Sequence, residues 1–181
     1  MSDAEVARLA AKTQLLLMDV DGVMTDGKLL FVPMPDGTVV EAKAFDSVDG
    51  SGIGLARRAG IKFGIITGRS SPAVARRAAE LRFDFCYQGL GRRKIAAFDD
   101  IAAKVAMTPD AMCYIGDDVQ DIPLLRRVGF PVAVSNACVE ARNAAAYVTR
   151  NAGGHGAVRE VIEVILRAQD KWDSAIAEFF I

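Results

Sequence analysis

Short apolar runs alternate along this chain with segments in which apolar residues recur at helical spacing. The apolar runs predict strands at residues 15–20, 62–67, 83–87, 112–115 and 130–134. Alanine, arginine and leucine at intervals of three and four predict helices at residues 51–58, 72–81, 94–105, 121–128 and 157–169. Because strands that alternate with helices over short connections form parallel sheets, we predict an α/β fold. Its doubly wound parallel sheet carries helices on both faces.

One stretch interrupts this alternation directly after the first predicted strand. Residues 28–32 and 38–45 read as two strands around an Asp36-Gly37 turn, which is typical of a β-hairpin. An isolated two-stranded hairpin is marginally stable unless it packs against something. We therefore predict a hairpin insertion at about residues 28–45 that lies over or beside the functional site and acts in assembly. The alternative is an edge ribbon without a function.

Composition fits a self-contained globular protein. Of 181 residues, 51% are hydrophobic, which suits one domain over residues 1–181 with a substantial core. The formal net charge is -1 without a long run of lysine or arginine, which argues against nucleic acid as a partner. No apolar stretch reaches membrane-spanning length, and the acidic start does not resemble a signal peptide. We expect a cytoplasmic protein, with Cys86, Cys113 and Cys138 reduced and buried.

Two clusters of aspartate stand where predicted strands end. Asp19 and Asp21 follow the first strand, and Asp117, Asp118 and Asp121 follow the run at 112–115. The crevice beyond the carboxyl ends of parallel strands is the usual ligand site of such a sheet. Because several oxygen ligands suit Mg²⁺, which keeps waters that a phosphate can replace, we predict a magnesium-dependent phosphoryl-transfer site.

Two further residues between these clusters suit phosphate. Thr67, before Gly68, ends a predicted strand and could donate its hydroxyl and nearby backbone N–H groups to a phosphate oxygen. Lys94 stands at a predicted helix start, where its ammonium could offset the charge of a carboxylate and a phosphate. Each observation alone is weak, because Thr-Gly ends many strands and a surface lysine at a helix start is common.

The order of these motifs is more specific than any one of them, and it resembles the haloacid dehalogenase superfamily of phosphatases. The resemblance implies that Asp19 is the nucleophile and forms an aspartyl-phosphate. Asp21 would protonate the leaving oxygen and then activate water. Thr67 and Lys94 would bind the transferring phosphoryl group. The alternative, that the aspartates only cap helices and turns, does not account for the ordered set.

The same resemblance implies a set of metal-binding residues. Asp19 and Asp117 would hold Mg²⁺ through their side chains, and Asp21 through its backbone carbonyl. Asp118 and Asp121 would orient the site, and we include Asp118 among the metal-binding residues. Metal contact would keep one carboxyl group ionised, while repulsion from nearby carboxylates would favour protonation of another.

Further features narrow the resemblance over almost the whole chain. A cap domain is missing, the hairpin follows the first motif, and residues 44–53 and 147–161 resemble the 3-deoxy-D-manno-octulosonate 8-phosphate phosphatase family. This capless branch acts in the cytoplasmic synthesis of the lipopolysaccharide sugar Kdo. The resemblance implies a homotetramer in which the hairpins form a central barrel and one subunit helps to close its neighbour's site. The tail at about 168–181 also resembles the family's C-terminal segment.

Two departures from the family concern the sugar. Val48 stands where the family commonly has a basic residue, and His155 where an arginine often stands. Arg69 and Arg77 are then the expected partners of the substrate carboxylate, although Arg77 could instead lie on a solvated helix face. The predicted substrate-binding residues are Asp49, Gly50, Thr67, Gly68, Arg69, Arg77, Lys94 and His155.

We therefore expect a phosphomonoesterase that hydrolyses Kdo 8-phosphate, or alternatively a related nonulosonate 9-phosphate. A catalytically inactive assembly module is a further alternative. A two-component receiver domain also combines acidic residues, Mg²⁺, Thr and Lys, but no Asp closes the 62–67 strand as a receiver requires. For enclosure of the site, the sequence offers the hairpin, the 153–156 loop and a tail stripe. We expect that stripe to lie on one helical face, and it consists of Trp172, Ile176, Phe179 and Phe180.

Overall fold

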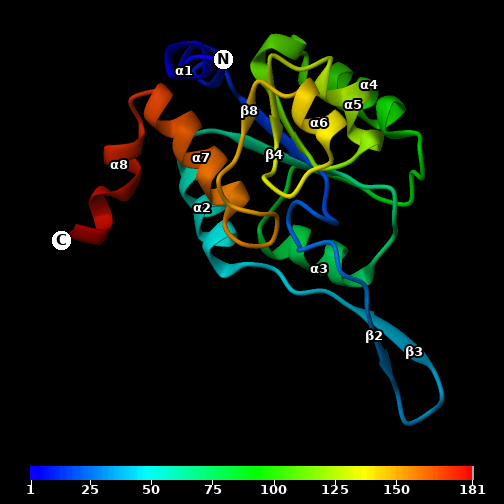
Figure 1. Ribbon diagram of the computed structural model, residues 1–181. Helices are drawn as coiled ribbons and strands as arrows, with labels where there is room; N and C mark the ends of the chain where they lie inside the picture. The colour runs from blue at the N-terminus through cyan, green and yellow to red at the C-terminus, as the bar shows by residue number, and fades with distance from the viewer. Residues whose placement is uncertain (181) are drawn as a thin grey trace.

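Six parallel strands form the main sheet, in the order β5-β4-β1-β6-β7-β8 (Figure 1). The computed structural model describes residues 1–180. The strands are β1 (Leu15–Met18), β4 (Lys62–Ile66), β5 (Phe85–Tyr87), β6 (Met112–Gly116), β7 (Phe130–Ala133) and β8 (Tyr147–Val148). The predicted parallel sheet is thus confirmed, with β8 added at one edge. A two-residue strand is too short to show a strand pattern in sequence.

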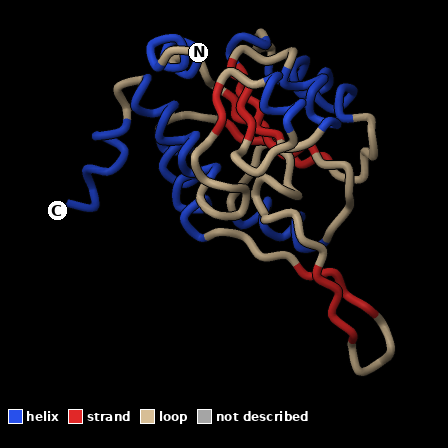
Figure 2. The backbone as a smooth tube through the Cα atoms, viewed as in Figure 1, coloured by secondary structure: helices blue, strands red, loops and turns tan. Residues whose placement is uncertain are grey.

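Helices cover both faces of this sheet, as predicted. The helices α4, α5 and α6 lie together on one face, and α1, α2 and α7 pack together on the other (Figures 1 and 2). Their bounds are α1 (Asp3–Ala10), α2 (Ser47–Arg58), α3 (Pro72–Glu80), α4 (Lys94–Val105), α5 (Ile122–Leu125), α6 (Val139–Ala144), α7 (Ala157–Ala168) and α8 (Trp172–Ile176). The α2 helix begins four residues earlier than predicted, because the Asp46 side chain accepts the Val48 N–H and caps it.

The central strands are apolar throughout because both of their faces are covered. Every residue of β1 and β6 is buried. The register pairs Met18 of β1 with Ile65 of β4 on one side and with Ile115 of β6 on the other. These three strands therefore end side by side, and the residues that follow them meet at one edge of the sheet.

The predicted hairpin is present as a separate two-stranded sheet. Strands β2 (Leu30–Pro33) and β3 (Val39–Ala42) pair antiparallel, and Gly37 adopts the positive φ of 84° that the turn requires. The hairpin projects from the body of the molecule (Figure 2). Its large apolar side chains are exposed, with Phe31 at 56% and Val39 at 62%.

The tail differs from its prediction. The α8 helix ends at Ile176 and continues as a 3-10 helix over Ala177–Phe180, so the apolar stripe does not share one α-helical face. Trp172 is buried, whereas Phe179 and Phe180 are exposed. Residue 181, the last of the predicted tail, lies outside the described residues.

Two other expectations can be compared with residues 1–180. All three cysteines are free, but only Cys113 is buried; Cys138 is half-buried and Cys86 is exposed, so the prediction that each is buried is confirmed for Cys113 alone. Cys86 lies in β5, the strand at one edge of the sheet. No helix in the described part of the chain is long and apolar enough to cross a membrane.

Candidate active site

Asp19 directly follows β1, and its carboxylate lies against a buried lysine. The Lys94 Nζ atom is 2.7 Å from Asp19 Oδ2 and 2.7 Å from Asp121 Oδ1. Lys94 is the first residue of α4, and only 2% of it is exposed. It joins the aspartate clusters of the first and last motifs, which are almost a hundred residues apart in the sequence. The alternative, an ordinary surface lysine at a helix start, is wrong at this position.

A third carboxylate completes this group. Asp19, Asp117 and Asp121 each offer an oxygen atom, and these atoms lie within 4.8 Å of one another. Asp121 is fully buried and accepts hydrogen bonds from the Tyr114 hydroxyl at 2.7 Å and the Asp117 N–H at 3.0 Å. The Oδ1 atom of Asp117, in contrast, is buried without a hydrogen-bond partner.

The protonation equilibria of the group follow from this crowding. Burial, and then the charge of Asp121, raise the pKa of Asp19 to about 6. Burial, with Asp121 and Asp19 beside it, raises the pKa of Asp117 to about 8. Burial lowers the pKa of Lys94, but the two carboxylates outweigh burial and raise it above its usual value. Three carboxylates around one ammonium leave excess negative charge and an unpartnered oxygen, which a divalent cation with oxygen ligands would fit.

Asp21 does not join this group. Its carboxylate forms an ion pair with the ammonium of Lys43, which immediately follows β3 of the hairpin. The Arg69 Nε atom lies 3.9 Å from the other carboxylate oxygen. The two aspartates of the first motif therefore have different charged partners, Lys94 for Asp19 and Lys43 for Asp21.

Sequence reasoning missed the hairpin residues at this site. Lys43 also lies 3.0 Å from Glu41, and Glu41 in turn binds the guanidinium of Arg69. The sequence predicts a hairpin over or beside the functional site with a role in assembly, but it does not single out Glu41 or Lys43 as site residues. Glu41 and Lys43 are two residues apart and share one face of an extended chain, and this charged face next to an acidic motif was the available indication. Tyr114 was also missed, because a tyrosine in a buried strand reads as core.

Thr67 follows β4 and lies at the same edge of the sheet as Asp19. It is buried, and its N–H donates to the Tyr87 carbonyl at 2.9 Å. The next residue, Gly68, accepts from the Gly91 N–H at 3.0 Å, and a Cβ atom there would lie 3.0 Å from the Gly91 oxygen. The loop before Lys94 thus packs directly on the Thr-Gly turn.

The glycine-rich loop before α7 packs on the first acidic loop. The Gly154 N–H donates to the Val23 carbonyl at 3.0 Å, and the Gly153 N–H donates to Asn136 Oδ1 at 2.7 Å. A Cβ atom at Gly153 would lie 1.7 Å from the Gly22 oxygen. Only glycine permits this approach of the two backbones.

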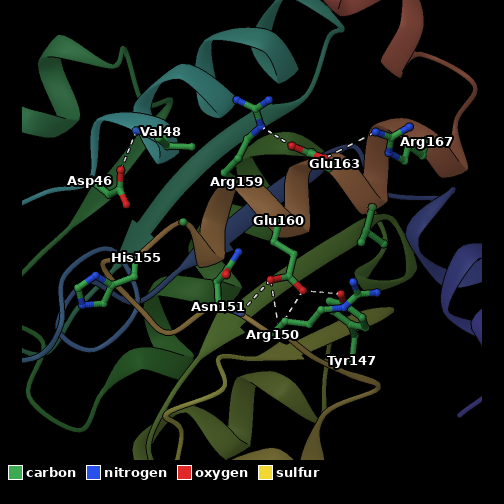
Figure 3. Close-up of a pocket in the computed structure, with 12 residues that line it drawn as sticks. Asp46, Val48, Tyr147, Arg150, Asn151, His155, Arg159, Glu160, Glu163 and Arg167 are labelled. Carbon is green, nitrogen blue, oxygen red and sulfur yellow. Dashed lines mark hydrogen bonds and ion pairs between the residues drawn. The ribbon is translucent and has the colours of Figure 1, made fainter.

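His155 does not point into the carboxylate group. Together with Val48, Arg150 and Arg159, it lines a cavity of about 680 Å³ between α7, the start of α2 and the 150–156 loop (Figure 3). Neither Asp19 nor any other carboxylate of the group lines this cavity. Val48 and His155, the two positions of the predicted departures, therefore line the same cavity.

Two predicted substrate-binding residues have other surroundings. Asp49 is buried, and its carboxylate accepts the Arg159 N–H at 2.7 Å, so it caps the start of α7 from α2. Gly50 makes room for an arginine, because a Cβ atom there would lie 2.4 Å from Arg77 Nη2. The structure places neither residue at the carboxylate group, and the Asp49 carboxylate faces the start of α7.

Arg77 lies behind the hairpin rather than on a solvated face, so that alternative is wrong. Its guanidinium donates to the Asp46 carbonyl at 3.4 Å and lies 5.9 Å from the centre of the Phe45 ring. Its Nε atom is buried without a hydrogen-bond partner. Arg77 also lines a cavity of about 350 Å³ together with Lys43.

Asp118 also lies apart from the carboxylate group. Its side chain is exposed and accepts the Val119 N–H at 2.8 Å, which caps the short 3-10 helix Val119–Asp121. The predicted metal ligand Asp118 is thus outside the group of carboxylate oxygens that could hold an ion. Asp121, predicted only to orient the site, is the residue that contributes an oxygen to the group.

Comparison with known proteins agrees with this geometry. The profile of the haloacid dehalogenase-like hydrolase family, Hydrolase_3, matches residues 88–162. The 3-deoxy-D-manno-octulosonate 8-phosphate phosphatase KdsC of Escherichia coli (strain K12) is 43% identical over 172 residues, which span 95% of this chain and 89% of that protein. The KdsC of Yersinia pestis is 41% identical over 171 residues, or 94% of this chain and 89% of that protein. The chain belongs to the KdsC family.

Solved structures of the family share the fold. The 3-deoxy-D-manno-octulosonate 8-phosphate phosphatase from Moraxella catarrhalis, in complex with magnesium, phosphate and KDO, has a TM-score of 0.90 at 40% identity, covering 97% of this chain and 98% of that one. The cobalt-bound enzyme from Haemophilus influenzae has a TM-score of 0.85 at 34% identity, with 95% and 98% covered. The predicted resemblance, including the capless fold with its hairpin, is confirmed.

Proposed function

We propose that this protein is a magnesium-dependent phosphomonoesterase that hydrolyses 3-deoxy-D-manno-octulosonate 8-phosphate to Kdo and phosphate, in the cytoplasmic synthesis of lipopolysaccharide precursor. The observation that carries the proposal is the buried group in which Lys94 joins Asp19 to Asp121, with the unpartnered Asp117 oxygen beside them. This arrangement occurs in a chain that is 43% identical to a phosphatase of that name.

In the proposed mechanism, an oxygen of Asp19 attacks phosphorus and the bond from phosphorus to the sugar oxygen breaks. Asp21 gives its proton to that leaving oxygen. Water then attacks the aspartyl-phosphate while Asp21 takes the proton from it, which releases phosphate and restores Asp19. Lys94 and Thr67, with the neighbouring Gly68, bind the equatorial oxygens and offset their charge.

Asp19 and Asp117 would hold Mg²⁺ through their side chains and Asp21 through its backbone carbonyl, with Asp121 adjacent. The bound ion would neutralise the phosphoryl oxygens and reduce the repulsion between a carboxylate nucleophile and an anionic substrate. The crystal structure from Moraxella catarrhalis holds magnesium, phosphate and KDO together, which supports this assignment.

For the acidic sugar, Arg69 is the better placed of the two predicted arginines, because it lies beside Asp21. Arg77 remains a candidate through the cavity that it shares with Lys43. A related nonulosonate 9-phosphate is the second candidate substrate. It is favoured by one observation, that Val48 and His155 both depart from the family and line the same cavity.

A homotetramer joined by the hairpins is part of this proposal. The exposed apolar side chains of β2 and β3 support it, because a hairpin of this kind is stable only when it is covered. The tail or the 153–156 loop would lie near a neighbour's site, and the exposed Phe179 and Phe180 suit such a contact.

A phosphate-release assay tests the function. We expect the highest kcat/KM for Kdo 8-phosphate in a panel with nonulosonate 9-phosphates and hexose phosphates. EDTA should remove the activity and Mg²⁺ restore it, whereas Ca²⁺ should restore little because of its longer and looser coordination. Undiminished turnover in verified metal-free protein would contradict the metal assignment. A nonulosonate 9-phosphate as best substrate would favour the second candidate.

A further inference from the structure

Lys43 is a buried lysine at the base of an otherwise exposed hairpin. Only 1% of its side chain is exposed. Lys43 directly follows β3, which ends at Ala42. It forms ion pairs with Asp21 and with Glu41. Burial lowers the pKa of Lys43, but the two carboxylates outweigh burial and raise it above its usual value. The residue therefore remains a cation next to the Asp21 carboxyl group.

Glu41 places a second carboxylate next to this lysine. One Glu41 oxygen lies 3.0 Å from Lys43, and the other binds the guanidinium of Arg69. Lys43 is thus tied to the hairpin on one side and to Asp21 on the other. Its arrangement matches that of Lys94, which lies between Asp19 and Asp121. Each of the two carboxyl groups of the first motif has one buried lysine of its own.

We infer that Lys43 is a positioning residue for the acid and base step: it holds the Asp21 carboxyl group in one orientation from the hairpin base. This inference rests on the proposed function. An unrestrained aspartate side chain rotates about χ2 with broad preference. Loss of the ion pair would let the carboxyl group leave the orientation from which it protonates the sugar oxygen. The hairpin would then serve the chemistry as well as assembly.

The leaving group provides the first test. A sugar alkoxide needs a proton as it departs, whereas p-nitrophenolate needs little help. Lys43→Met keeps the length of the side chain without its charge. We expect it to lower kcat/KM for Kdo 8-phosphate by about 10- to 100-fold, a fraction of the contribution of a general acid. For p-nitrophenyl phosphate we expect a loss below about 3-fold. Lys43→Arg should recover part of the loss.

Matched variants separate this role from a loss of folding. Lys28→Met removes an exposed hairpin lysine that pairs with Asp26, and it should leave both activities unchanged. Glu41→Gln removes the ion pairs of Glu41 with both Lys43 and Arg69, so its effect on the sugar phosphate is not specific to Lys43. Circular dichroism and the thermal midpoint of each variant report on folding. An equal loss on both substrates in a folded Lys43→Met protein would overturn the inference.

A double-mutant cycle gives the second test. If Lys43 acts through Asp21, Lys43→Met should cause no further loss of kcat/KM in an Asp21→Asn background. An additive loss, or a rise in KM alone, would mean that Lys43 contacts the substrate independently and would overturn the inference. If the wild-type enzyme hydrolyses other sugar phosphates but not Kdo 8-phosphate, the proposed substrate fails. The Lys43 comparison can then be made with the sugar phosphate that is hydrolysed.

Discussion

Asp19 and Asp21 are two residues apart, yet the fold gives them different partners. Asp19 is buried with Lys94 and two other carboxylates, and Asp21 turns toward the hairpin and Lys43. Separate lysines on separate elements provide separate surroundings for the two carboxyl groups.

The nucleophile can be tested by a nearly isosteric substitution. Asp19→Asn should lower kcat by about 10³-fold or more, because the amide cannot attack phosphorus. The fold should remain, since the amide still accepts a hydrogen bond from Lys94. Phosphate release and circular dichroism measure the two effects. A wild-type kcat, after mass spectrometry has excluded deamidation, would contradict the assignment.

Metal binding should be linked to pH through the buried carboxylates. In the folded protein without metal, burial and the neighbouring carboxylates raise the pKa of Asp19 to about 6 and that of Asp117 to about 8. The folded state then binds protons more tightly than the unfolded state. These groups therefore make the metal-free protein less stable as pH rises from about 4 to about 8. Mg²⁺ binds the ionised carboxylates and removes this penalty.

We expect the rise in thermal midpoint upon addition of Mg²⁺ to be larger at pH 8 than at pH 5. Differential scanning fluorimetry at a fixed Mg²⁺ concentration measures this rise. Comparing the midpoints with and without Mg²⁺ at the same pH cancels the effect of titratable groups that do not contact the metal. Asp117→Asn should raise the midpoint of the metal-free protein at pH 8 and reduce the response to Mg²⁺. An equal or larger shift at pH 5 would be incompatible with this linkage.

At the scale of elements, the site is assembled by loops that pack on one another at the carboxyl edge of the sheet. The 153–156 loop contacts the first acidic loop through backbone atoms, and Asp49 of α2 caps α7 directly behind it. The helices α2 and α7 therefore support the nucleophile loop without contributing a side chain to the carboxylate group.

This packing predicts a strong effect of one methyl group. Gly153→Ala should destabilise the protein by about 1–3 kcal/mol and lower kcat, because its Cβ atom would collide with the Gly22 backbone. The matched control is Gly54→Ala in α2, where nothing lies within 4 Å of the added atom. This control should stabilise the protein by about 0.5–1 kcal/mol. Urea denaturation measures the free energy of unfolding of both variants. An unchanged free energy of unfolding for Gly153→Ala would show that the loop can shift to accommodate the methyl group.

At the scale of the whole molecule, the hairpin stands away from the body with apolar side chains uncovered, while its base reaches Asp21. The described residues, 1–180, form no cap domain that could enclose a sugar. A site of this kind benefits from closure by another subunit, since phosphoryl transfer is favoured when water is excluded.

Replacing Phe31 and Val39 with glutamate should break the proposed tetramer. Turnover of the sugar phosphate should fall more than turnover of p-nitrophenyl phosphate, which needs less enclosure. Analytical ultracentrifugation and kcat/KM report on the two effects. Val139→Glu changes an equally exposed residue on α6 and should alter neither. A fully active wild-type monomer at the assay concentration would overturn the proposed assembly.

The sequence by itself determined the α/β alternation, the hairpin and the ordered motifs around Asp19, Thr67, Lys94 and Asp117. Buried parallel strands must be apolar and a tight turn requires glycine. The strands and the hairpin can therefore be predicted from short stretches of sequence. Parallel strands end at one edge, so the carboxylates that follow β1 and β6 were expected to meet there.

Only the tertiary structure decided which charged residues pair. It turned Asp118 outward and Asp121 inward, placed Asp49 under α7, and brought Lys43 from the hairpin to Asp21. Which residues pair depends on the direction of each side chain and on contacts between segments that are distant in the sequence. For this reason, one aspartate can be exposed while a nearby one is buried. A local pattern records the spacing of charges, but the folded chain sets the distances that determine their pKa values and their partners.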